Sequence, residues 1–537
     1  MPKSIFILLL LLSSIYAGSI TVDHSYFRKA PDYDNGTVHM FIKNDSDKDI
    51  TVSKIILNDV PMDNMPNELA IWYQVVPDSI KAGKISDVMV KLIRPTNKLV
   101  KIEIEASNGD KSECVVQPIQ PPLKLTYIGF GEKYDEVYFY VQNLGKEPYT
   151  MNKIFLNSKD ETKSTKIVGL TRINSQEKVC GIIKLKTPLS SGEYISLKVT
   201  TKEDEDILTE AVVRVYNYFP VQAFGDELRD ELGFDKDRFC IYKYPEKEED
   251  WEKAETSKSH RAYHLIDDPA CGDAKSGILG FNAKEIIERG KECRKKDSVH
   301  PTLVYLCAYE KPKNYFVYGE LTDITFVNPY QVVFSEEKPE RDGYFTGLAK
   351  LACEPKILMT IPEAFTEKGK RYPTPEEERI LVYSEIVNGS KGLWYWTRTK
   401  EKGGYESNAA LEKEIGVINR EINTIKKYLI IGETFDLVTT SDAKVEANAI
   451  LCGDKGIILI LINKDYESSF ESDKIPFVSV SKYNITVSIK VPNGFNKISS
   501  VSEVTNGMLA ELKYIQKDDI VVLCIDKLDI TKQYILK

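Results

Sequence analysis

Two stretches of this chain repeat one another. "VHMFIKNDSDKDITVSKIILND" begins at Val38 and "VYFYVQNLGKEPYTMNKIFLNS" begins at Val137, so that Asn44 aligns with Asn143, 99 positions later. Each copy alternates apolar and polar residues, breaks at a polar turn and then alternates again, which is typical of a β-hairpin in a sandwich of about 100 residues. The repeat therefore predicts two tandem β-sandwiches.

The boundaries of these sandwiches follow from the linker between the copies. We expect the first Ig-like β-sandwich over residues 20–118 and the second over residues 121–215. The segment "QPIQPP" joins them, and its double proline makes it stiff.

The pattern changes after residue 215. Seven strand-like runs now alternate with helical stretches: "PVQAF", "RFCIYKY", "AYHLI", "TLVYLC", "DITFVNPY", "KILMTIP" and "GLWYW". Helix starts are indicated by Asn282, and by Thr374 followed by Pro375 and a capping-box Glu377. Repeated β-then-α units predict parallel strands with helical crossovers. Residues 216–430 are therefore either an open doubly wound sheet or a (β/α) barrel.

The two ends of the chain have different characters. Helical periodicity ends near residue 440, and "ANAILCGDKGIILILIN" predicts a hairpin inside a C-terminal β-sandwich over residues 440–537. At the other end, Lys3, a short apolar run and small residues near Ala17 predict a signal peptide over residues 1–19. We expect a secreted, periplasmic or cell-surface protein that does not insert into a membrane after cleavage.

Composition excludes several classes of function. With 81 acidic and 72 basic residues, the chain lacks the positive charge expected of a nucleic-acid-binding protein. Nine cysteines without C-x-x-C spacing are expected to be buried free thiols, and five scattered histidines predict no metal site. Glycine loops without a phosphate-binding pattern give no support to a nucleotide, so we expect no cofactor.

The catalytic and ligand-binding residues of a parallel β/α domain are expected at the carboxyl ends of its strands. "AYHLI" ends in Asp267 and Asp268, "KILMTI" ends in Pro362 and Glu363, and "GLWYW" ends in Trp396. Carboxyl groups on two strands suit glycosidic bond cleavage, in which one acid protonates the leaving oxygen and another carboxylate attacks or activates water. Indole faces stack well on sugar rings.

The segments that run from "YHLIDDP" through "YGELTDITFVNPYQV" and "GLWYWTR" to "EIGVINREINTIKKYL" resemble the second half of secreted glycoside hydrolase-type (β/α) barrels. Such barrels occur in bacterial multidomain proteins, usually with flanking β-sandwiches. The resemblance covers about 219–429 and implies Asp268 as the acid/base and Glu363, in the loop after its strand, as the nucleophile.

The chain departs from this family in two respects. The family has Glu where this chain has Asp268, and a side chain shorter by one methylene would stand about 1.5 Å further from the bond, a loss of about a hundredfold in rate. Seven strands are present where eight are expected. We expect the missing unit between Tyr244 and Arg261, where one short helix fits.

Two functions remain open. The first is a carbohydrate-active glycoside hydrolase for a polysaccharide or oligosaccharide; the second is a non-catalytic cell-surface or matrix protein whose barrel has lost its activity and whose sandwiches make the contacts. Asp267 and Asp268 could equally cap a turn, and Glu363 could be a solvated loop carboxyl. His264 is expected to be a satisfied interior residue. The predicted substrate-binding residues are Asp267, Asn328, Tyr330, Trp396, Arg398 and Tyr244.

Overall fold

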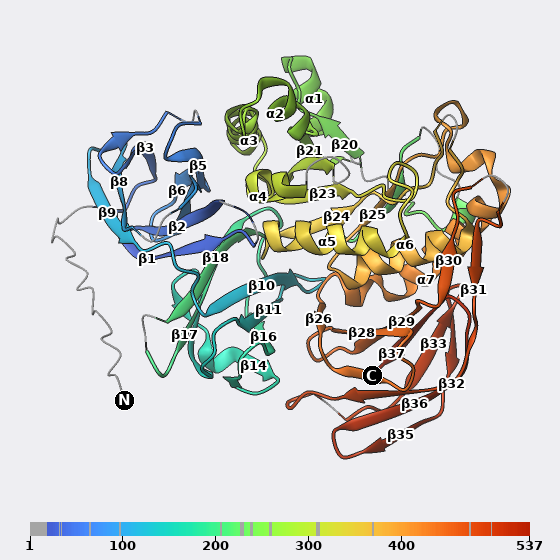
Figure 1. Ribbon diagram of the computed structural model, residues 1–537. Coiled ribbons are helices and arrows are strands. Elements are labelled where there is room, and N and C mark those ends of the chain that lie inside the picture. The colour runs from blue at the N-terminus through green and yellow to red at the C-terminus, as the bar shows by residue number, and fades with distance from the viewer. Residues whose placement is uncertain are drawn as a thin grey trace.

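The structure is a computed structural model (Figure 1). It describes residues 19–31, 33, 35–63, 66–95, 98–204, 207–225, 230–236, 240–256, 260–307, 312–367, 370–471, 474–495 and 497–537. Apart from Ser19, the predicted signal peptide lies outside these residues. Within them, no helix is both long and apolar enough to cross a membrane. Strands outnumber helices in the described chain, and they form sandwiches around one parallel sheet.

The first sandwich packs the sheet β1-β2-β7-β5 on the sheet β4-β3-β8-β9, with β6 paired to β3. Met40 and Ile42 of β2 face the second sheet, while Thr37 and His39 on its other face contact the barrel. The strands are β1 (Ile20–Lys29), β2 (Asn35–Asn44), β3 (Ile50–Leu57), β4 (Val60–Pro61), β5 (Ala70–Val76), β6 (Ser79–Ile80), β7 (Ile85–Ile93), β8 (Val100–Ala106) and β9 (Lys111–Val116).

The second sandwich has the same plan, with sheets β10-β11-β16-β14 and β13-β12-β17-β18, and β15 paired to β12. Its strands are β10 (Leu123–Phe130), β11 (Glu136–Asn143), β12 (Tyr149–Leu156), β13 (Lys159–Asp160), β14 (Thr165–Val168), β15 (Arg172–Ile173), β16 (Lys178–Lys184), β17 (Tyr194–Thr201) and β18 (Leu208–Arg214), with the short helix η1 (Thr162–Ser164). Leu125, Phe139, Ile154 and Leu197 belong to the core between its sheets.

The predicted hairpin within each copy of the repeat is wrong. β2 pairs with β1 and β7, whereas β3 pairs with β4, β6 and β8, so the connection crosses from one sheet to the other. The alternating pattern identifies a strand but not its partner.

A buried asparagine explains why the connection turns at this point. Asn44 Nδ2 donates to the carbonyls of Lys48 and Ile80 at 2.7 and 2.8 Å, and its Oδ1 accepts from the Ser46 N–H. Asn143 repeats these bonds in the second sandwich, and Asn463 repeats them in the third. Each asparagine thus satisfies the polar backbone of a turn that sheet bonding leaves open.

The seven predicted strands of the central domain are all present. They form one parallel sheet in the order β19-β25-β24-β23-β22-β21-β20. Their bounds are β19 (Val221–Ala223), β20 (Cys240–Lys243), β21 (His260–Asp267), β22 (Thr302–Cys307), β23 (Ile324–Asn328), β24 (Ile357–Thr360) and β25 (Leu393–Tyr395). In this order the last strand returns beside the first, which leaves β19 and β20 as the two edges.

The position expected for the missing unit is wrong. β20 and β21 are joined by α1 (Glu248–Thr256) and pair directly in parallel, so the crossover between them is complete. The discontinuity lies instead between β19 and β20, since no pairing between these strands is present among the described residues. η2 (Asp230–Leu232) lies in this connection.

The sheet curls around an aromatic interior. The Phe224 ring, directly after β19, lies 6.2 Å from the Tyr305 ring of β22, although three strands separate them in the sheet order. Phe326 and Trp394 join the same interior, 6.2 Å apart. Side chains therefore fill the half-barrel, and ligands can approach only at its ends.

The helices cover the outer face of the sheet and begin where sequence signals place them. Thr374 and Glu377 form the predicted capping box of α6. Asn282 precedes α3, but its side chain donates to the Pro269 carbonyl and does not cap the helix. The helices are α2 (Ala270–Ser276), α3 (Ala283–Lys296), η3 (Pro312–Asn314), α4 (Tyr315–Tyr318), α5 (Glu340–Cys353), α6 (Pro375–Val387), η4 (Lys400–Lys402), η5 (Tyr405–Ser407) and α7 (Ala409–Leu429).

The C-terminal sandwich packs beneath α6 and α7 (Figure 1). Its sheets are β26-β28-β29-β37-β33-β34 and β27-β32-β36-β35, and the predicted hairpin of β28 and β29 is confirmed. The strands are β26 (Glu433–Phe435), β27 (Val438–Thr440), β28 (Val445–Leu451), β29 (Ile457–Asn463), β30 (Tyr466–Ser468), β31 (Phe477–Ser479), β32 (Lys482–Lys490), β33 (Val501–Thr505), β34 (Met508–Glu511), β35 (Tyr514–Lys517), β36 (Ile520–Leu528) and β37 (Thr531–Leu536).

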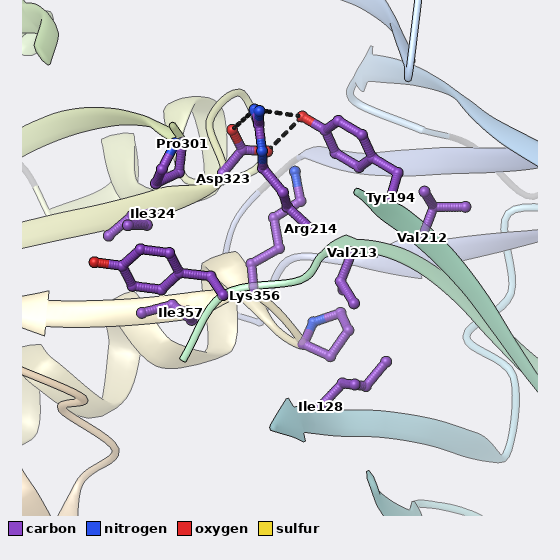
Figure 2. Close-up of a pocket in the computed structure, with 12 residues that line it drawn as sticks. Ile128, Tyr194, Val212, Val213, Arg214, Pro301, Asp323, Ile324, Lys356 and Ile357 are labelled. Carbon is purple, nitrogen blue, oxygen red and sulfur yellow. Dashed lines mark hydrogen bonds and ion pairs between the residues drawn. The ribbon is translucent and has the colours of Figure 1, made fainter. Parts of the chain in front are cut away.

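Ion pairs join the N-terminal sandwiches to the amino end of the barrel. Figure 2 shows Arg214 and Tyr194 of the second sandwich directed at Asp323, which precedes β23; Arg214 Nη1 lies 3.2 Å from Asp323 Oδ2. From the first sandwich, Arg28 and Lys91 lie 3.3 and 3.2 Å from the Glu320 carboxylate. This end of the barrel is thus covered by protein.

Candidate ligand-binding site

A β-bulge decides which of the paired aspartates faces the interior of the barrel. His264 lies opposite Leu303 in β22, and Asp267 lies opposite Tyr305, so three steps along β21 match two along β22. The extra residue reverses the alternation and places Asp267 in the same phase as His264. Asp267 is exposed, and its charge acts on both His264 and Tyr305. Asp267 therefore lies at the carboxyl end of the barrel interior, which we call the mouth.

Asp268 turns away from the mouth. Its backbone adopts a left-handed φ of 40° and its N–H donates to the Tyr305 carbonyl. The Asp268 carboxylate accepts from the Cys271 thiol, at 3.1 Å, and its charge acts on Tyr315 and Tyr318 of α4. These two tyrosines pack with the helices outside the sheet. The residue predicted as the acid is thus directed toward the helical layer.

Glu363 lies beside Trp396 at the end of β24 but is closed off from solvent. Its carboxyl group is 0% exposed. Oε1 accepts from the Val332 N–H at 2.8 Å and Oε2 from the Val333 N–H at 2.6 Å. Burial raises the pKa of Glu363 to about 8, although these two hydrogen bonds oppose the shift. Burial therefore favours the neutral acid, and the two N–H groups hold the carboxyl group in a backbone turn.

Further buried carboxyl groups surround Glu363. Asp342 of α5 accepts from the Gln331 N–H, and Glu378 and Glu385 lie on α6. Burial and mutual repulsion raise the pKa of Asp342 and Glu378 well above the usual range and that of Glu385 to about 8. We call Asp342, Glu363, Glu378 and Glu385 the buried acid cluster. Among the described residues, no group of three or more acidic, His or Cys side chains has an arrangement that could hold a metal ion.

Aromatic rings form the wall and floor of the mouth. The partly exposed rings of Phe224 and Trp396 meet edge to face with centroids 4.9 Å apart. Below them, the Tyr305 ring stacks on the His264 imidazole at 4.0 Å. Trp394 is buried against Phe224 and Phe326 and serves as packing. An aromatic wall above a polar floor suits the apolar face and the hydroxyl groups of a sugar.

The remaining predicted residues are Asn328, Tyr330, Arg398 and Tyr244, and they do not all lie at the mouth. Asn328 ends β23 in the phase of Phe326, beside Tyr330, whose ring packs on Phe334 and Phe365. The Arg398 N–H donates to the Phe224 carbonyl, at the edge of the aromatic wall.

Tyr244 points elsewhere. Its hydroxyl donates to Glu292 and its ring lies under Arg289, both on α3. The structure therefore places Tyr244 on the outer face of the sheet.

Sequence reasoning missed Phe224 as a site residue and assigned His264 to the core. Phe224 follows β19, one of the two shortest strands of the parallel sheet, and the run "PVQAF" does not indicate that its last residue faces the mouth. His264 is in phase with Ala262, and the phase of a polar residue in an otherwise apolar strand could have indicated it.

Similarity to known proteins is found among solved structures. No protein-family model and no curated protein matches the chain. Similar solved structures are glycoside hydrolases. One is a GH2 β-galacturonidase from Eisenbergiella tayi, with 10% identity and a TM-score of 0.26, covering 73% of this chain and 90% of that one.

A second is β-glucuronidase 2 from Bacteroides uniformis, with 9% identity and a TM-score of 0.27, covering 95% of this chain and 76% of that one. A third is a GH51 arabinofuranosidase from Xanthomonas axonopodis pv. citri, with 8% identity and a TM-score of 0.32, covering 55% of this chain and 70% of that one. All three TM-scores are below 0.5, so nothing about the ligand or reaction of this chain follows from them.

Proposed function

We propose that this protein binds a saccharide at the mouth of its barrel and does not cleave it. The observation that carries the proposal is the state of Glu363, whose two carboxyl oxygens are both taken by backbone N–H groups and are removed from solvent. A nucleophile or base must reach the anomeric carbon or its attacking water. Glu363 reaches neither in this arrangement.

The position of Asp268 supports the same conclusion. A general acid must stand within hydrogen-bond reach of the leaving oxygen. Asp268 instead accepts from Cys271 and lies beside Tyr315 in the helical layer. What remains at the mouth is the edge-to-face pair of Phe224 and Trp396, the exposed Asp267 and the polar floor.

Hydrolysis is the second candidate, and one observation favours it. The raised pKa of Glu363, at a strand end beside Trp396, is the kind of perturbation that active sites show. In this version the turn at Val332 and Val333 releases Glu363 when substrate binds. Asp268 or the neighbouring Asp267 then supplies the second carboxyl.

The test measures binding and turnover on the same preparation. The purified protein is titrated with cellohexaose, xylohexaose, laminarihexaose, mannohexaose and oligogalacturonate, and is assayed on aryl glycosides of the same sugars. We expect binding without turnover, and about tenfold weaker binding for Trp396→Ala, since truncation of a central aromatic contact costs about this much. Tyr344→Ala, an exposed aromatic on α5, is the matched control and should bind as the parent does.

Hydrolysis, the second candidate, predicts a different result in these assays. Turnover that disappears in Glu363→Gln and in Asp268→Asn or Asp267→Asn would establish the hydrolase and overturn the binding-only proposal. Binding to none of the five oligosaccharides, or binding that Trp396→Ala leaves unchanged, would overturn the placement of the ligand at the mouth.

A further inference from the structure

The floor of the mouth holds a hydrogen-bond acceptor that no described residue of the protein uses. His264 is 6% exposed and lies in the barrel interior, where its ring stacks on Tyr305. Its Nε2 lies 2.8 Å from the Ile266 carbonyl oxygen. A carbonyl oxygen can only accept, so Nε2 carries a hydrogen.

The second ring nitrogen is therefore the acceptor. Burial lowers the pKa of His264, and this outweighs the Asp267 charge and the bond to the Ile266 carbonyl, which oppose it; Lys243 and Arg289 add to the lowering. A lowered pKa favours the neutral ring. A neutral imidazole with hydrogen on Nε2 has its lone pair on Nδ1. Within the described part of the chain Nδ1 has no hydrogen-bond partner, and it is not among the atoms closed off in the core.

Tyr305 supplies a second such group next to the first. Its side chain is 9% exposed, and its hydroxyl makes no hydrogen bond to any described residue. Neither atom is closed off from solvent, so each can bond to water or to a hydroxyl group of a bound molecule. Phe224, 6.2 Å from the Tyr305 ring, connects this floor to the Trp396 wall.

We propose that a hydroxyl group of the bound saccharide donates to Nδ1 of His264 while the Tyr305 hydroxyl bonds to the same or the adjacent sugar oxygen. The inference deepens the proposed function by naming the polar contacts of that site, and it rests on that function. It also changes the role expected for His264, from a satisfied interior residue to one with one satisfied and one open nitrogen.

Nuclear magnetic resonance of the protein with ¹⁵N-labelled histidine tests the first half without any ligand. The His264 signals should show hydrogen on Nε2 and none on Nδ1 at pH 7. Addition of the oligosaccharide that binds in the titration should shift the Nδ1 resonance. Hydrogen on Nδ1, or a doubly protonated ring, would overturn the inference and leave saccharide binding untouched.

Substitutions test the second half. His264→Phe keeps a stacking ring without the acceptor and should weaken binding about tenfold, the usual loss for one hydrogen bond. His264→Asn, whose amide oxygen can replace Nδ1, should recover part of this loss, and Tyr305→Phe should weaken binding several-fold. His300→Phe, at the amino end of the barrel beside Asp297, is the control and should bind as the parent does.

The outcomes separate the two proposals. Binding that His264→Phe leaves unchanged would overturn this inference while the proposed function stands. Failure of all five oligosaccharides to bind would overturn both, even with the tautomer as expected.

Discussion

The pKa values of buried carboxyl groups are shifted in opposite directions at the two ends of the barrel. At the amino end, Glu320 and Asp323 lie among Arg28, Lys91 and Arg214, and these cations lower the pKa of both carboxyls despite burial. Toward the carboxyl end, the buried acid cluster of Asp342, Glu363, Glu378 and Glu385 has raised pKa values. The carboxyl groups at both ends are buried, so burial alone does not explain the contrast.

The difference shows which end is built for stability. The charges of Glu320 and Asp323 are matched by cations of the N-terminal sandwiches, because an uncompensated charge in an interface is expensive. Unmatched carboxyl groups destabilise a fold, and chains commonly retain such features near functional sites. The contrast therefore agrees with a ligand site at the carboxyl end, where the mouth lies.

The largest effect is expected from removing the anion at the amino end. Glu320→Gln leaves Arg28, Lys91 and His39 buried with one partner fewer, and loss of one member of a buried ionic cluster costs about 3–5 kcal/mol. Urea unfolding followed by tryptophan fluorescence measures the loss. Glu446→Gln, which breaks a partly exposed pair with Lys464, is the control and should leave the midpoint nearly unchanged.

In the buried acid cluster, removal of a carboxyl group is expected to stabilise the protein and not to destabilise it. The pKa of Glu385 rises from 4.5 to about 8 on folding, so its contribution to stability is fully present below pH 4.5 and is lost as pH rises toward 8. Glu385→Gln cannot ionise and escapes this loss. The stability of the variant relative to the parent should increase by up to about 1.4 kcal/mol per pH unit across that window.

Unfolding curves at pH 4.5, 6 and 8 give the comparison. Glu471→Gln is the control: it removes an exposed carboxyl group of the C-terminal domain, so its effect on stability should not change with pH in this way. If the stability of Glu385→Gln relative to the parent does not change with pH, the pKa of Glu385 is not raised on folding. The contrast between the two ends of the barrel would then be wrong.

The sequence predicts the strands of this molecule better than their relations. Apolar runs bounded by polar residues located all seven parallel strands, and the Thr374 capping box located α6. The same runs could not show that β2 and β3 lie in different sheets, since alternation is a property of one strand. The open edge between β19 and β20 could not be predicted from the sequence either, because it depends on which strands pair.

The site was harder to predict for a related reason. The β-bulge between His264 and Asp267 adds one residue to one strand of a pair, and it exchanges the directions of Asp267 and Asp268. No period in the sequence reveals a bulge. Glu363 was placed correctly at a strand end, but the turn that bonds its carboxyl comes from Val332 and Val333, which are about thirty residues away.

The smallest effect concerns His39, which lies between Asp87 of the first sandwich and Glu320 at the amino end of the barrel. Its Nδ1 lies 2.8 Å from Asp87 and its Nε2 lies 3.3 Å from Glu320, and these anions raise its pKa although burial opposes them. The stability this adds is fully present below pH 6.5 and is lost as pH rises through the raised value. His39→Gln should therefore cost on the order of 1 kcal/mol at pH 6 and less at pH 9. Urea unfolding at both values measures the cost; a cost that grows with pH would mean that His39 is neutral in the folded protein and that Arg28 and Lys91 alone compensate Glu320.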